Sequence, residues 1–423
     1  MLQRFNILVS AYACEPGRGS EPEVGWQWAL NLSRHHDVTV ITRANNAAAI
    51  QAALDKHTGP KPQFLYYDLP SGLVRLKRLG LPVPIYYLLW QAAIRWRFRR
   101  QLNAFDLIHH LTFNSFRQPG FWWFCPKPVV LGPLGGGQIC PWPFLLRFGR
   151  GLPQELFRSL TVLAAPLYPH LLLSFFCARL ILVANGDTAA RIPKWWRPKV
   201  RHLLETGINL KSGASTENHA PGPGTRLIWT GRLEKIKGLD LMLHAFAQAR
   251  QQNAALTLTI VGGGSEAEDM KQLAGRLNLG SSVRWAGQVP KDKIEETLAG
   301  HDIFLFTSLR DTSGNVLLEA MAAGLPSITL RHQGAAEIAT EATSLRIVPT
   351  TFAATTTALA QAIRRLSGDD SLRSRMSAAA RLRVLEHYAW SQKAVMMDRF
   401  YRELVSPDDA SAEVAASNPT LRD

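Results

Sequence analysis

The chain has 423 residues, of which 46% are hydrophobic and 19% charged, and its formal net charge is +15. This length and apolar content are enough for two folded cores, since domains commonly have about 100–150 residues. The most apolar stretch, residues 160–176, is interrupted by Pro166, Pro169 and His170. No uninterrupted run reaches the ~18 apolar residues that a membrane-spanning helix needs.

The cysteines argue against a zinc-binding or disulfide-rich protein, and the first residues argue against a secreted one. Cys14, Cys125, Cys140 and Cys177 form no Cys-x-x-Cys pair and no zinc-like cluster, so we expect buried, reduced thiols of a cytosolic protein. Met-Leu-Gln-Arg leads directly into a predicted strand, without the charged and apolar leader of a signal peptide. We therefore expect a cytoplasmic protein, either soluble or peripheral on the inner face of the cell membrane.

Strands and helices alternate along the first half of the chain, which is typical of a parallel sheet with helices on both faces. The predicted strands are residues 5–13, 37–42, 63–68, 107–111, 129–131, 180–184 and 200–204. The predicted helices are residues 26–34 and 46–57 and a long apolar stretch, 144–177. The glycine-rich segment 15–25 joins the first strand to the first helix, and its Gly19 permits close approach of the backbone to a ligand.

Nearly all of the excess positive charge lies in this half. Residues 1–210 hold 24 Lys/Arg and 10 Asp/Glu, whereas residues 211–423 hold 24 and 23. Much of the excess falls in segments 74–82 and 90–100, where basic residues are interleaved with Trp, Phe and Leu. This pattern fits a surface that binds anionic lipid headgroups, and it fits a solvated basic helix with a buried aromatic stripe equally well.

Two further features of the first half are candidates for contact with a substrate. His109 and His110 are adjacent near the end of the strand 107–111, where a side chain can contact a ligand or have a structural role. Gly136 is the middle residue of a Gly-Gly-Gly turn, which permits close backbone approach but also serves as a plain turn.

The second half repeats the alternation after a linker. Residues 211–224 are rich in Ser, Gly and Pro, which indicates the linker. The predicted strands and helices that follow are residues 227–230, 239–250, 256–261, 266–277, 283–286, 303–306, 327–330, 352–366, 371–386 and 391–404. The tail from residue 406 is small, polar and acidic, which predicts disorder.

Two strand-to-helix junctions of the second half carry groups suited to a sugar nucleotide. The first is Gly-Arg-Leu-Glu-Lys-Ile-Lys-Gly, in which Arg232 supplies a planar fork of donors and Lys237 a point charge for a diphosphate. The second begins at Asp311 and opens a helix on which Glu319 follows eight residues later. Its Ser313-Gly314-Asn315-Val316 turn offers free amides to an anion, and the two carboxylates can accept hydrogen bonds from sugar hydroxyls. Basic loops and capped helices are often merely solvated, but two such junctions in one domain favour a binding site.

With these motifs, residues 5–404 resemble the retaining glycosyltransferases of family 4, the group 1 glycosyltransferases. The resemblance is strong in the second half and looser in the first. It implies the α/β GT-B fold, in which two Rossmann-like, doubly wound parallel-sheet domains face a central cleft. The expected parts are an acceptor-binding domain (1–210), the linker (211–224), a nucleotide-sugar-binding domain (225–385), a helix that crosses back to the first domain (386–405) and the disordered tail (406–423).

The resemblance also implies roles for the named residues. Arg232 and Lys237 match the family's phosphate motif, and Asp311 and Glu319 match its Glu-x7-Glu pair, with Asp in place of the first Glu. The catalytic candidates are then Arg232, Lys237, Asp311 and the cleft histidine that the family often carries after the strand 107–111. His109 and His110 compete for that place; we favour His110, with a structural role for the other. The residues expected to bind substrate are Gly19, Gly136, Arg232, Lys237, Ser313, Gly314, Asn315, Val316 and Glu319.

The predicted reaction is transfer of a hexose, with retention, from a UDP- or GDP-linked sugar to a lipid-linked or polysaccharide acceptor. No Asp-x-Asp triad and no His/Cys cluster occurs, so we expect neither metal nor cofactor beyond the donor. Three alternatives remain: a sugar-nucleotide epimerase, a non-catalytic membrane-associated protein of the same fold, and a nucleic-acid binder. No nucleic-acid motif accompanies the basic charge, so we expect no nucleic acid partner.

Overall fold

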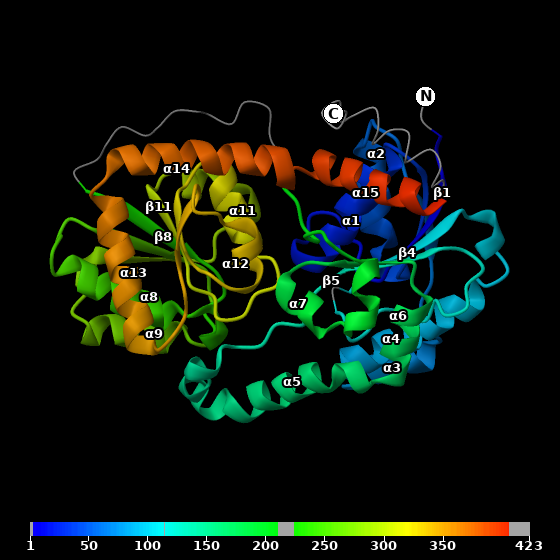
Figure 1. The fold of residues 1–423 in the computed structure, drawn as a ribbon, viewed down its shortest axis with the longest axis horizontal. Helices are drawn as coiled ribbons and strands as arrows, with labels where there is room; N and C mark the ends of the chain where they lie inside the picture. The colour runs from blue at the N-terminus through cyan, green and yellow to red at the C-terminus, as the bar shows by residue number, and fades with distance from the viewer. Residues whose placement is uncertain (1–2, 114, 210–223, 406–423) are drawn as a thin grey trace, which may run out of the picture. The chain divides into compact units, whose positions relative to one another are not determined.

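A computed structural model of the chain describes residues 3–113, 115–209 and 224–405 (Figure 1). Most of the predicted linker and the whole predicted tail from residue 406 lie outside the described residues. The chain divides into two compact units. The first contains residues 1–137, 162–206 and 390–423, and the second contains residues 138–161 and 207–389.

The first unit is built on a seven-stranded parallel sheet in the order β3-β2-β1-β4-β5-β6-β7. The chain starts in the middle of the sheet and winds outward in both directions, as in a Rossmann fold. The strands are β1 (Asn6–Ala11), β2 (Asp37–Thr42), β3 (Gln63–Tyr66), β4 (Leu107–Thr112), β5 (Val129–Leu134), β6 (Leu180–Val183) and β7 (Val200–His202). Every residue of β4, β5 and β6 is buried, which explains their nearly continuous apolar runs.

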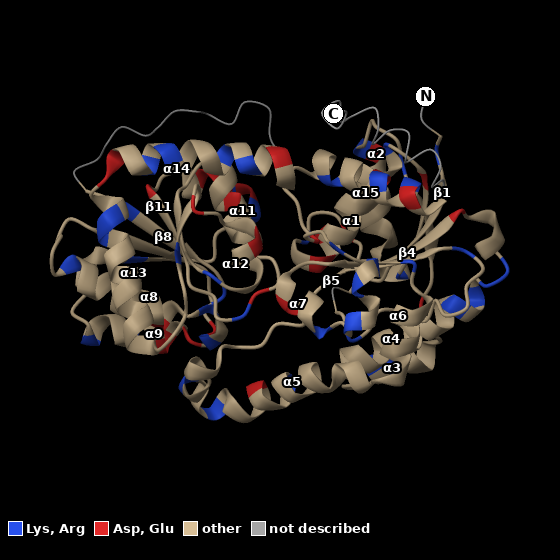
Figure 2. Ribbon diagram, viewed as in Figure 1, with Lys and Arg blue, Asp and Glu red and all other residues tan. Residues whose placement is uncertain are grey.

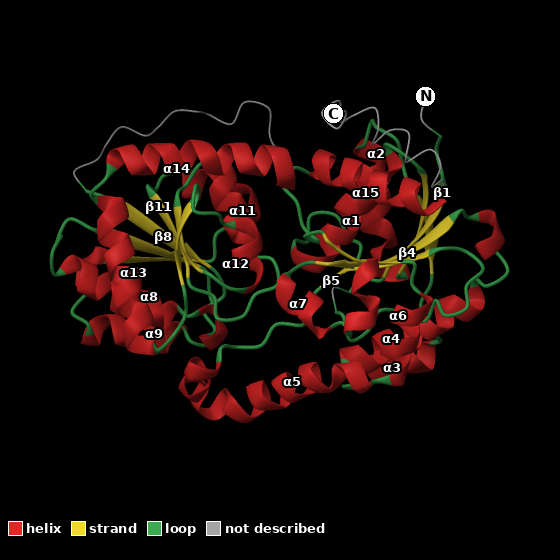
Figure 3. Ribbon diagram, in the orientation of Figure 1, coloured by secondary structure: helices red, strands yellow, loops and turns green. Residues whose placement is uncertain are grey.

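Helices cover both faces of this sheet. On one face, α1 (Ser20–Ser33), α2 (Ala47–Lys56) and α15 (Trp390–Val405) pack around Trp28, whose ring meets that of Trp390. On the other face lie α3 (Ser71–Arg78), α4 (Val83–Arg97) and α6 (Pro169–Cys177), and the short α7 (Gly186–Arg191) follows β6 (Figure 3). Helix α1 begins six residues earlier than predicted, so the loop after β1 ends at Gly19.

The second unit is built on a six-stranded parallel sheet in the order β10-β9-β8-β11-β12-β13. The strands are β8 (Arg226–Thr230), β9 (Thr257–Val261), β10 (Val283–Gly287), β11 (Ile303–Phe306), β12 (Ser327–Leu330) and β13 (Ser344–Ile347). The helices are α8 (Leu239–Arg250), α9 (Ala267–Arg276), α10 (Ile294–Ala299), α11 (Asn315–Ala322), α12 (Gln333–Ile338), α13 (Phe352–Ser367) and α14 (Asp370–Arg383). Helices α8, α9 and α13 lie on one side of the sheet and α11 and α12 on the other (Figure 3). The predicted fold class, two doubly wound parallel α/β sheets, is confirmed.

One segment of the first half differs from its predicted placement. Residues 138–161 were expected in a first domain of residues 1–210, but they belong to the second unit. The physical reason is the burial of Phe144, Leu145 and Phe148, which are at most 6% exposed and lie in the hydrophobic core of the second unit. The final helix, α15, belongs to the first unit.

The predicted long helix over residues 144–177 is also wrong, because the chain breaks it twice. Gly149 adopts φ 52° and ψ −120° and so kinks the chain inside a 3₁₀ stretch (Trp142–Gly151), after which α5 (Leu152–Ala164) begins. A second break at residues 165–168 precedes α6. Within the described residues no single helix meets the length and apolarity needed to cross a bilayer; residues 142–167 and 169–177, bent by 53°, meet the criterion only as a pair.

The four cysteines are free thiols. Cys14 and Cys140 are buried, as expected, whereas Cys125 and Cys177 are partly exposed.

Candidate functional site

The loops that follow β8 and β11 meet at the carboxyl edge of the second sheet. These strands are neighbours although they are the first and fourth strands of the unit, so the chain turns in opposite directions from them. Open α/β sheets bind ligands at this point, outside the carboxyl ends of the strands. The two loops are joined by the Leu309 N–H, which donates to the Ile236 carbonyl oxygen at 2.8 Å, and by the Thr307 hydroxyl, which donates to the Lys237 carbonyl oxygen at 3.2 Å.

An ion pair between Lys237 and Asp311 lies at this junction. The ammonium nitrogen of Lys237 is 2.5 Å from Oδ2 of Asp311, and the two side chains are 18% and 19% exposed. The other carboxylate oxygen of Asp311 accepts from the Gly314 N–H at 3.3 Å. The Asp311 carboxylate therefore bridges the Lys237 ammonium and the backbone at the start of α11.

The amino terminus of α11 adds backbone donors to this edge. Gly314 is its N-cap, with φ 68° and ψ 55°, and no side chain caps the first amides. Ser313 instead directs its hydroxyl to the Asn315 side chain at 2.9 Å. A Cβ on Gly314 would lie 2.9 Å from the Phe306 ring, so glycine is required by both the turn and the packing. Amides at such a helix start attract phosphate groups.

Glu319 lies one turn further along α11 and is largely buried. Burial raises the pKa of its carboxyl, and the Lys291 ammonium opposes this rise. A partly desolvated carboxylate forms stronger hydrogen bonds than a solvated one, which suits it to hold sugar hydroxyls. Val316, on the first turn of the same helix, is intermediate in exposure.

Arg232 is the most exposed of the predicted phosphate ligands. Its side chain is 70% exposed and pairs with Glu234 at 2.6 Å. The loop that carries Arg232 is tightly packed from behind, since a Cβ on Gly262 would lie 1.9 Å from the Gly231 carbonyl oxygen and one on Gly264 would lie 2.4 Å from that of Leu233. The Gly262-Gly-Gly264 run is thus needed for the packing of two loops.

The structure encloses both candidate histidines of the first unit. His109 is 0% exposed and His110 1%. Burial lowers the pKa of His109 to about 4 and that of His110 to about 3. Both imidazoles are therefore neutral at pH 7, and contact of either with a substrate requires a rearrangement of the residues that cover it.

The two histidines point to opposite faces of the sheet. His109 Nε2 donates to the Gly132 carbonyl oxygen at 2.5 Å, and its Nδ1 accepts from the Tyr401 hydroxyl of α15 at 2.6 Å. His110 lies against α4, with Nε2 3.1 Å from the Tyr87 hydroxyl and Nδ1 3.2 Å from the Ser10 hydroxyl. These bonds give His109 a structural role between β5 and α15.

Gly19 and Gly136 lie in loops at the carboxyl ends of β1 and β5. Gly19 adopts φ 73° directly before α1, and no atom lies within 4 Å of where its Cβ would be. Gly136 adopts φ 81°, and the next N–H, of Gly137, donates to the Thr188 hydroxyl at 3.3 Å. The open space at Gly19 leaves its backbone accessible, as a ligand-binding loop requires.

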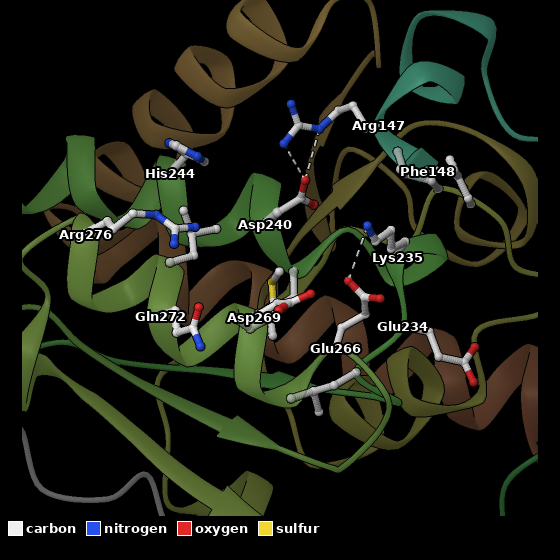
Figure 4. A pocket seen from close by; sticks show the side chains of 15 residues that line it. Arg147, Phe148, Glu234, Lys235, Asp240, His244, Glu266, Asp269, Gln272 and Arg276 are labelled. Atoms are coloured by element: carbon white, nitrogen blue, oxygen red, sulfur yellow. Dashed lines mark hydrogen bonds and ion pairs between the residues drawn. The ribbon is translucent and has the colours of Figure 1, made fainter. Parts of the chain in front are cut away.

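A cavity of about 270 Å³ lies elsewhere in the second unit, between α8 and α9 (Figure 4). Its walls include the Arg147–Asp240 and Lys235–Glu266 ion pairs, and Phe148 lies at one side. None of the predicted donor-binding residues lines it. Its wall does include Glu234, Lys235 and Leu309, so the cavity adjoins the loops that carry Lys237 and Asp311.

Three residues near Asp311 have no counterpart in the sequence motifs. Gln333 accepts the Asp311 N–H through its side-chain oxygen at 2.9 Å, Gln138 contacts Thr312, and Glu155 pairs with Arg310. Neutral amides and a lone acid inside an apolar helix carry no recognisable pattern, so sequence reasoning had no signal by which to find them.

The second half of the chain is similar in sequence to known glycosyltransferases. Residues 215–383 match the family model "Glycosyl transferases group 1". A putative colanic acid biosynthesis glycosyltransferase of Salmonella typhimurium is 27% identical over 183 residues, 40% of this chain and 45% of that protein. An amylovoran biosynthesis glycosyltransferase of Erwinia amylovora is 30% identical over 184 residues, 41% and 44% of the two chains. The chain thus spans about half the length of the curated relatives it matches.

Similarity of fold extends further than similarity of sequence. The crystal structure of Anabaena HepE in complex with UDP superposes with a TM-score of 0.60 over 95% of this chain and 100% of that chain, at 15% identity. Residues 215–383 are therefore a group 1 glycosyltransferase domain, and the chain as a whole resembles this family, also called family 4, in its GT-B fold.

Proposed function

We propose that this protein transfers a hexose, with retention of configuration, from a UDP- or GDP-linked sugar to a lipid-linked or polysaccharide acceptor in cell-surface or exopolysaccharide synthesis. The observation that carries the proposal is the Lys237–Asp311 pair at the junction of β8 and β11, beside the uncapped start of α11. A cation, free amides and two carboxylates at one sheet edge match the parts of a sugar nucleotide.

In the proposed mechanism the bond between the anomeric carbon and the diphosphate oxygen breaks while the bond to the acceptor oxygen forms on the same face. The acceptor hydroxyl proton passes to the departing phosphate, so no protein base is needed, and attack on the same face retains the configuration without a protein nucleophile. Lys237, Arg232 and the α11 amides stabilise the negative charge on the diphosphate, an effect for which one donor is commonly worth about 3–4 kcal/mol. Asp311 and Glu319 hold hydroxyls of the hexose and the ribose.

The named relatives support the acceptor class and the donor. Two of them are described as colanic acid and amylovoran biosynthesis glycosyltransferases, and both names refer to extracellular polysaccharides. Anabaena HepE is described in complex with UDP, which makes UDP the first nucleotide to test.

The decisive experiment is thermal stabilisation of the purified protein by UDP, GDP and ADP. We expect one nucleotide to raise the melting temperature, and an Arg232→Ala/Lys237→Ala variant to lose this rise. Lys235→Ala is the matched control, because Lys235 lies two residues from Lys237 in the same loop but pairs with Glu266 instead of Asp311. No shift with any nucleotide would contradict the proposal. Release of free nucleotide and an epimerised sugar without acceptor would favour the epimerase.

We also propose that the protein binds an anionic membrane, where it meets its acceptor. Residues 69–105 hold seven Lys/Arg and no Asp/Glu. The aromatic stripe of α4, including Tyr86, Tyr87 and Trp90, is buried, as the alternative of a solvated basic helix predicts. A second set of large apolar side chains is nevertheless exposed on α3, α4 and their ends: Leu76, Leu79, Val83, Ile85, Leu89 and Trp96.

Exposed arginines accompany this second set: Arg75, Arg78, Arg97, Arg99 and Arg100. A basic surface with projecting Leu and Trp favours the interface of a bilayer that contains acidic lipids. The location of the charges along the chain can be followed in Figure 2. This supports a peripheral position on the inner face of the membrane.

A further inference from the structure

The segment of residues 138–161 lies against the loop that carries Asp311. Phe144, Leu145 and Phe148 anchor it in the hydrophobic core of the second unit. The Arg147 guanidinium bonds the Asp240 carboxylate at 2.7 and 3.0 Å and lies 3.5 Å from the centre of the Phe352 ring. These contacts anchor the middle of the segment to the second unit. Other contacts, at the ends of the segment, reach the loop that carries Asp311.

Two side-chain amides hold the loop on either side of Asp311. Gln138 donates to the Thr312 hydroxyl at 2.5 Å. Gln333 accepts the Asp311 N–H at 2.9 Å through its oxygen and donates through its nitrogen to the Ile139 carbonyl oxygen at 2.7 Å. A single amide thus joins the backbone of Asp311 to the backbone of the segment.

The conformation of Gln333 agrees with a role of this kind. Its φ is 53°, in the left-handed region that non-glycine residues seldom adopt, and it is 5% exposed. The next residue, Gly334, lies so close that a Cβ would be 2.3 Å from the Thr312 carbonyl oxygen. An unfavourable backbone conformation persists where the surroundings hold it, as the two hydrogen bonds of Gln333 do.

A buried carboxylate completes the contact. Glu155 of α5 is 5% exposed and pairs with Arg310, the residue before Asp311, at 3.2 Å. Arg158, one turn along α5, lies 3.9 Å from Glu155 and donates to the Gln138 carbonyl oxygen at 2.9 Å. Removal of one partner from such an enclosed ion pair leaves the other charge without compensation.

We propose that Gln138, Glu155 and Gln333 are positioning residues, which hold the Asp311 loop in the conformation that binds the donor. None of them needs to touch the donor, since each acts through Arg310, Asp311 or Thr312. This proposal rests on the proposed function only for its kinetic consequence. Its structural part, the fixing of residues 310–312 by the segment 138–158, stands without any ligand.

The test compares Gln138→Ala and Glu155→Gln with a matched control, Arg147→Gln. Arg147 lies on the same segment and also forms an ion pair with the rest of the unit, but it does not contact residues 310–312. Hydrogen exchange of the peptide covering residues 307–316 is measured in the ligand-free proteins, together with UDP affinity and the KM and kcat of transfer. Melting temperatures verify that each variant is folded.

We expect exchange of residues 307–316 to become at least tenfold faster in Gln138→Ala and Glu155→Gln, and to remain unchanged in Arg147→Gln. The donor KM should rise about tenfold in the first two variants and stay constant in the control. Adding Arg310→Gln to Glu155→Gln removes the orphaned cation and should restore part of the melting temperature but not the KM.

Two outcomes separate the proposals. Unchanged exchange in both loop variants, with UDP affinity equal to that of the wild type, would refute the positioning role while leaving the transferase proposal intact. Failure of the wild type to bind any nucleoside diphosphate would refute the donor site, and the exchange data would still decide whether the segment fixes the loop.

Discussion

The backbone of Gly238 turns directly after Lys237, with φ 62° and ψ 34°, and leads into α8. A Cβ at this position would lie 2.3 Å from the carbonyl oxygen of Thr307, the first residue after β11. The hydroxyl of Thr307 accepts from Trp229 Nε1 at 3.1 Å, so the residue it would collide with is itself held in place. Gly238 is therefore required both for its φ and for the approach of the two site loops.

We expect Gly238→Ala to destabilise the protein by more than the cost of left-handed backbone alone, which is about 1–2 kcal/mol for a residue with a Cβ. Gly280→Ala is the matched control, because Gly280 also has a positive φ, of 45°, but no atom lies within 4 Å of the added Cβ. The free energy of unfolding, from urea titrations, measures both. Equal decreases in the free energy of unfolding of the two variants would contradict this, because they would mean that the loops move apart to accommodate the added Cβ at residue 238.

At this scale the sequence predicted residue types better than contacts. Arg232, Lys237, Asp311 and Glu319 stand out because strand, loop and helix follow one another locally. The ion pair between Lys237 and Asp311 joins residues 74 apart, and no local pattern reveals it. The choice between His109 and His110 assumed that one must face a ligand. In a sheet covered on both faces, adjacent strand residues point to opposite sides and both are buried.

At the scale of the element, α15 carries a buried lysine. Lys393 is 1% exposed, donates to the Leu204 carbonyl oxygen, and lies 5.5 Å from the centre of the Trp28 ring. Burial lowers the pKa of Lys393 to about 7, and the nearby Glu205 carboxylate opposes this shift. In the unfolded chain the pKa of the lysine is near 10.5.

The direction of the resulting pH dependence follows from proton counts. Between pH 7 and 10.5 the unfolded chain holds a proton on Lys393 that the folded protein lacks, so stability rises with pH in this window. The contribution approaches a tenfold change in the folding equilibrium constant per pH unit. We expect Lys393→Met to remove it. Urea midpoints of both proteins at pH 7, 8 and 9 test this, and parallel profiles would contradict it.

Helices and strands could be predicted where a run of apolar residues was bounded by turn-forming residues. All described strands of the two sheets except β13 were predicted, because continuous apolar runs of four to six residues are typical of buried parallel strands. The segment 144–177 was misassigned because its apolar residues continue across Gly149 and Pro166. Apolar character alone does not show which of two cores a segment enters, and Phe144 and Phe148 enter the second.

At the scale of the whole molecule, exposed arginines and exposed apolar side chains occur together in residues 75–100 of the first unit. The five exposed arginines of residues 75–100 would each contribute about 1 kcal/mol near an anionic surface, and insertion of Leu79 and Trp96 would add to this. We expect the protein to sediment with vesicles that contain phosphatidylglycerol, and less with pure phosphatidylcholine. High salt should reduce the bound fraction.

A pair of variants separates this surface from general stickiness. Leu79→Ser/Trp96→Ser should lower the bound fraction several-fold. Leu382→Ser/Leu385→Ser removes exposed apolar side chains from the second unit instead and should leave the bound fraction unchanged. UDP-dependent stabilisation should be the same in both. Equal binding to vesicles of the two lipid compositions would contradict the proposal that the arginines attract the protein to an anionic membrane.

Because residues 138–161 belong to the second unit, this unit cannot be exchanged with that of a relative as one piece of sequence. The chain passes between the units at residues 137/138, 161/162, 206/207 and 389/390, so neither unit is one continuous stretch of sequence. A chimera that exchanges only residues 207–389 with a relative would leave Phe144, Leu145 and Phe148 facing a foreign core. Transplanting donor specificity intact therefore requires two separate pieces of sequence to move together.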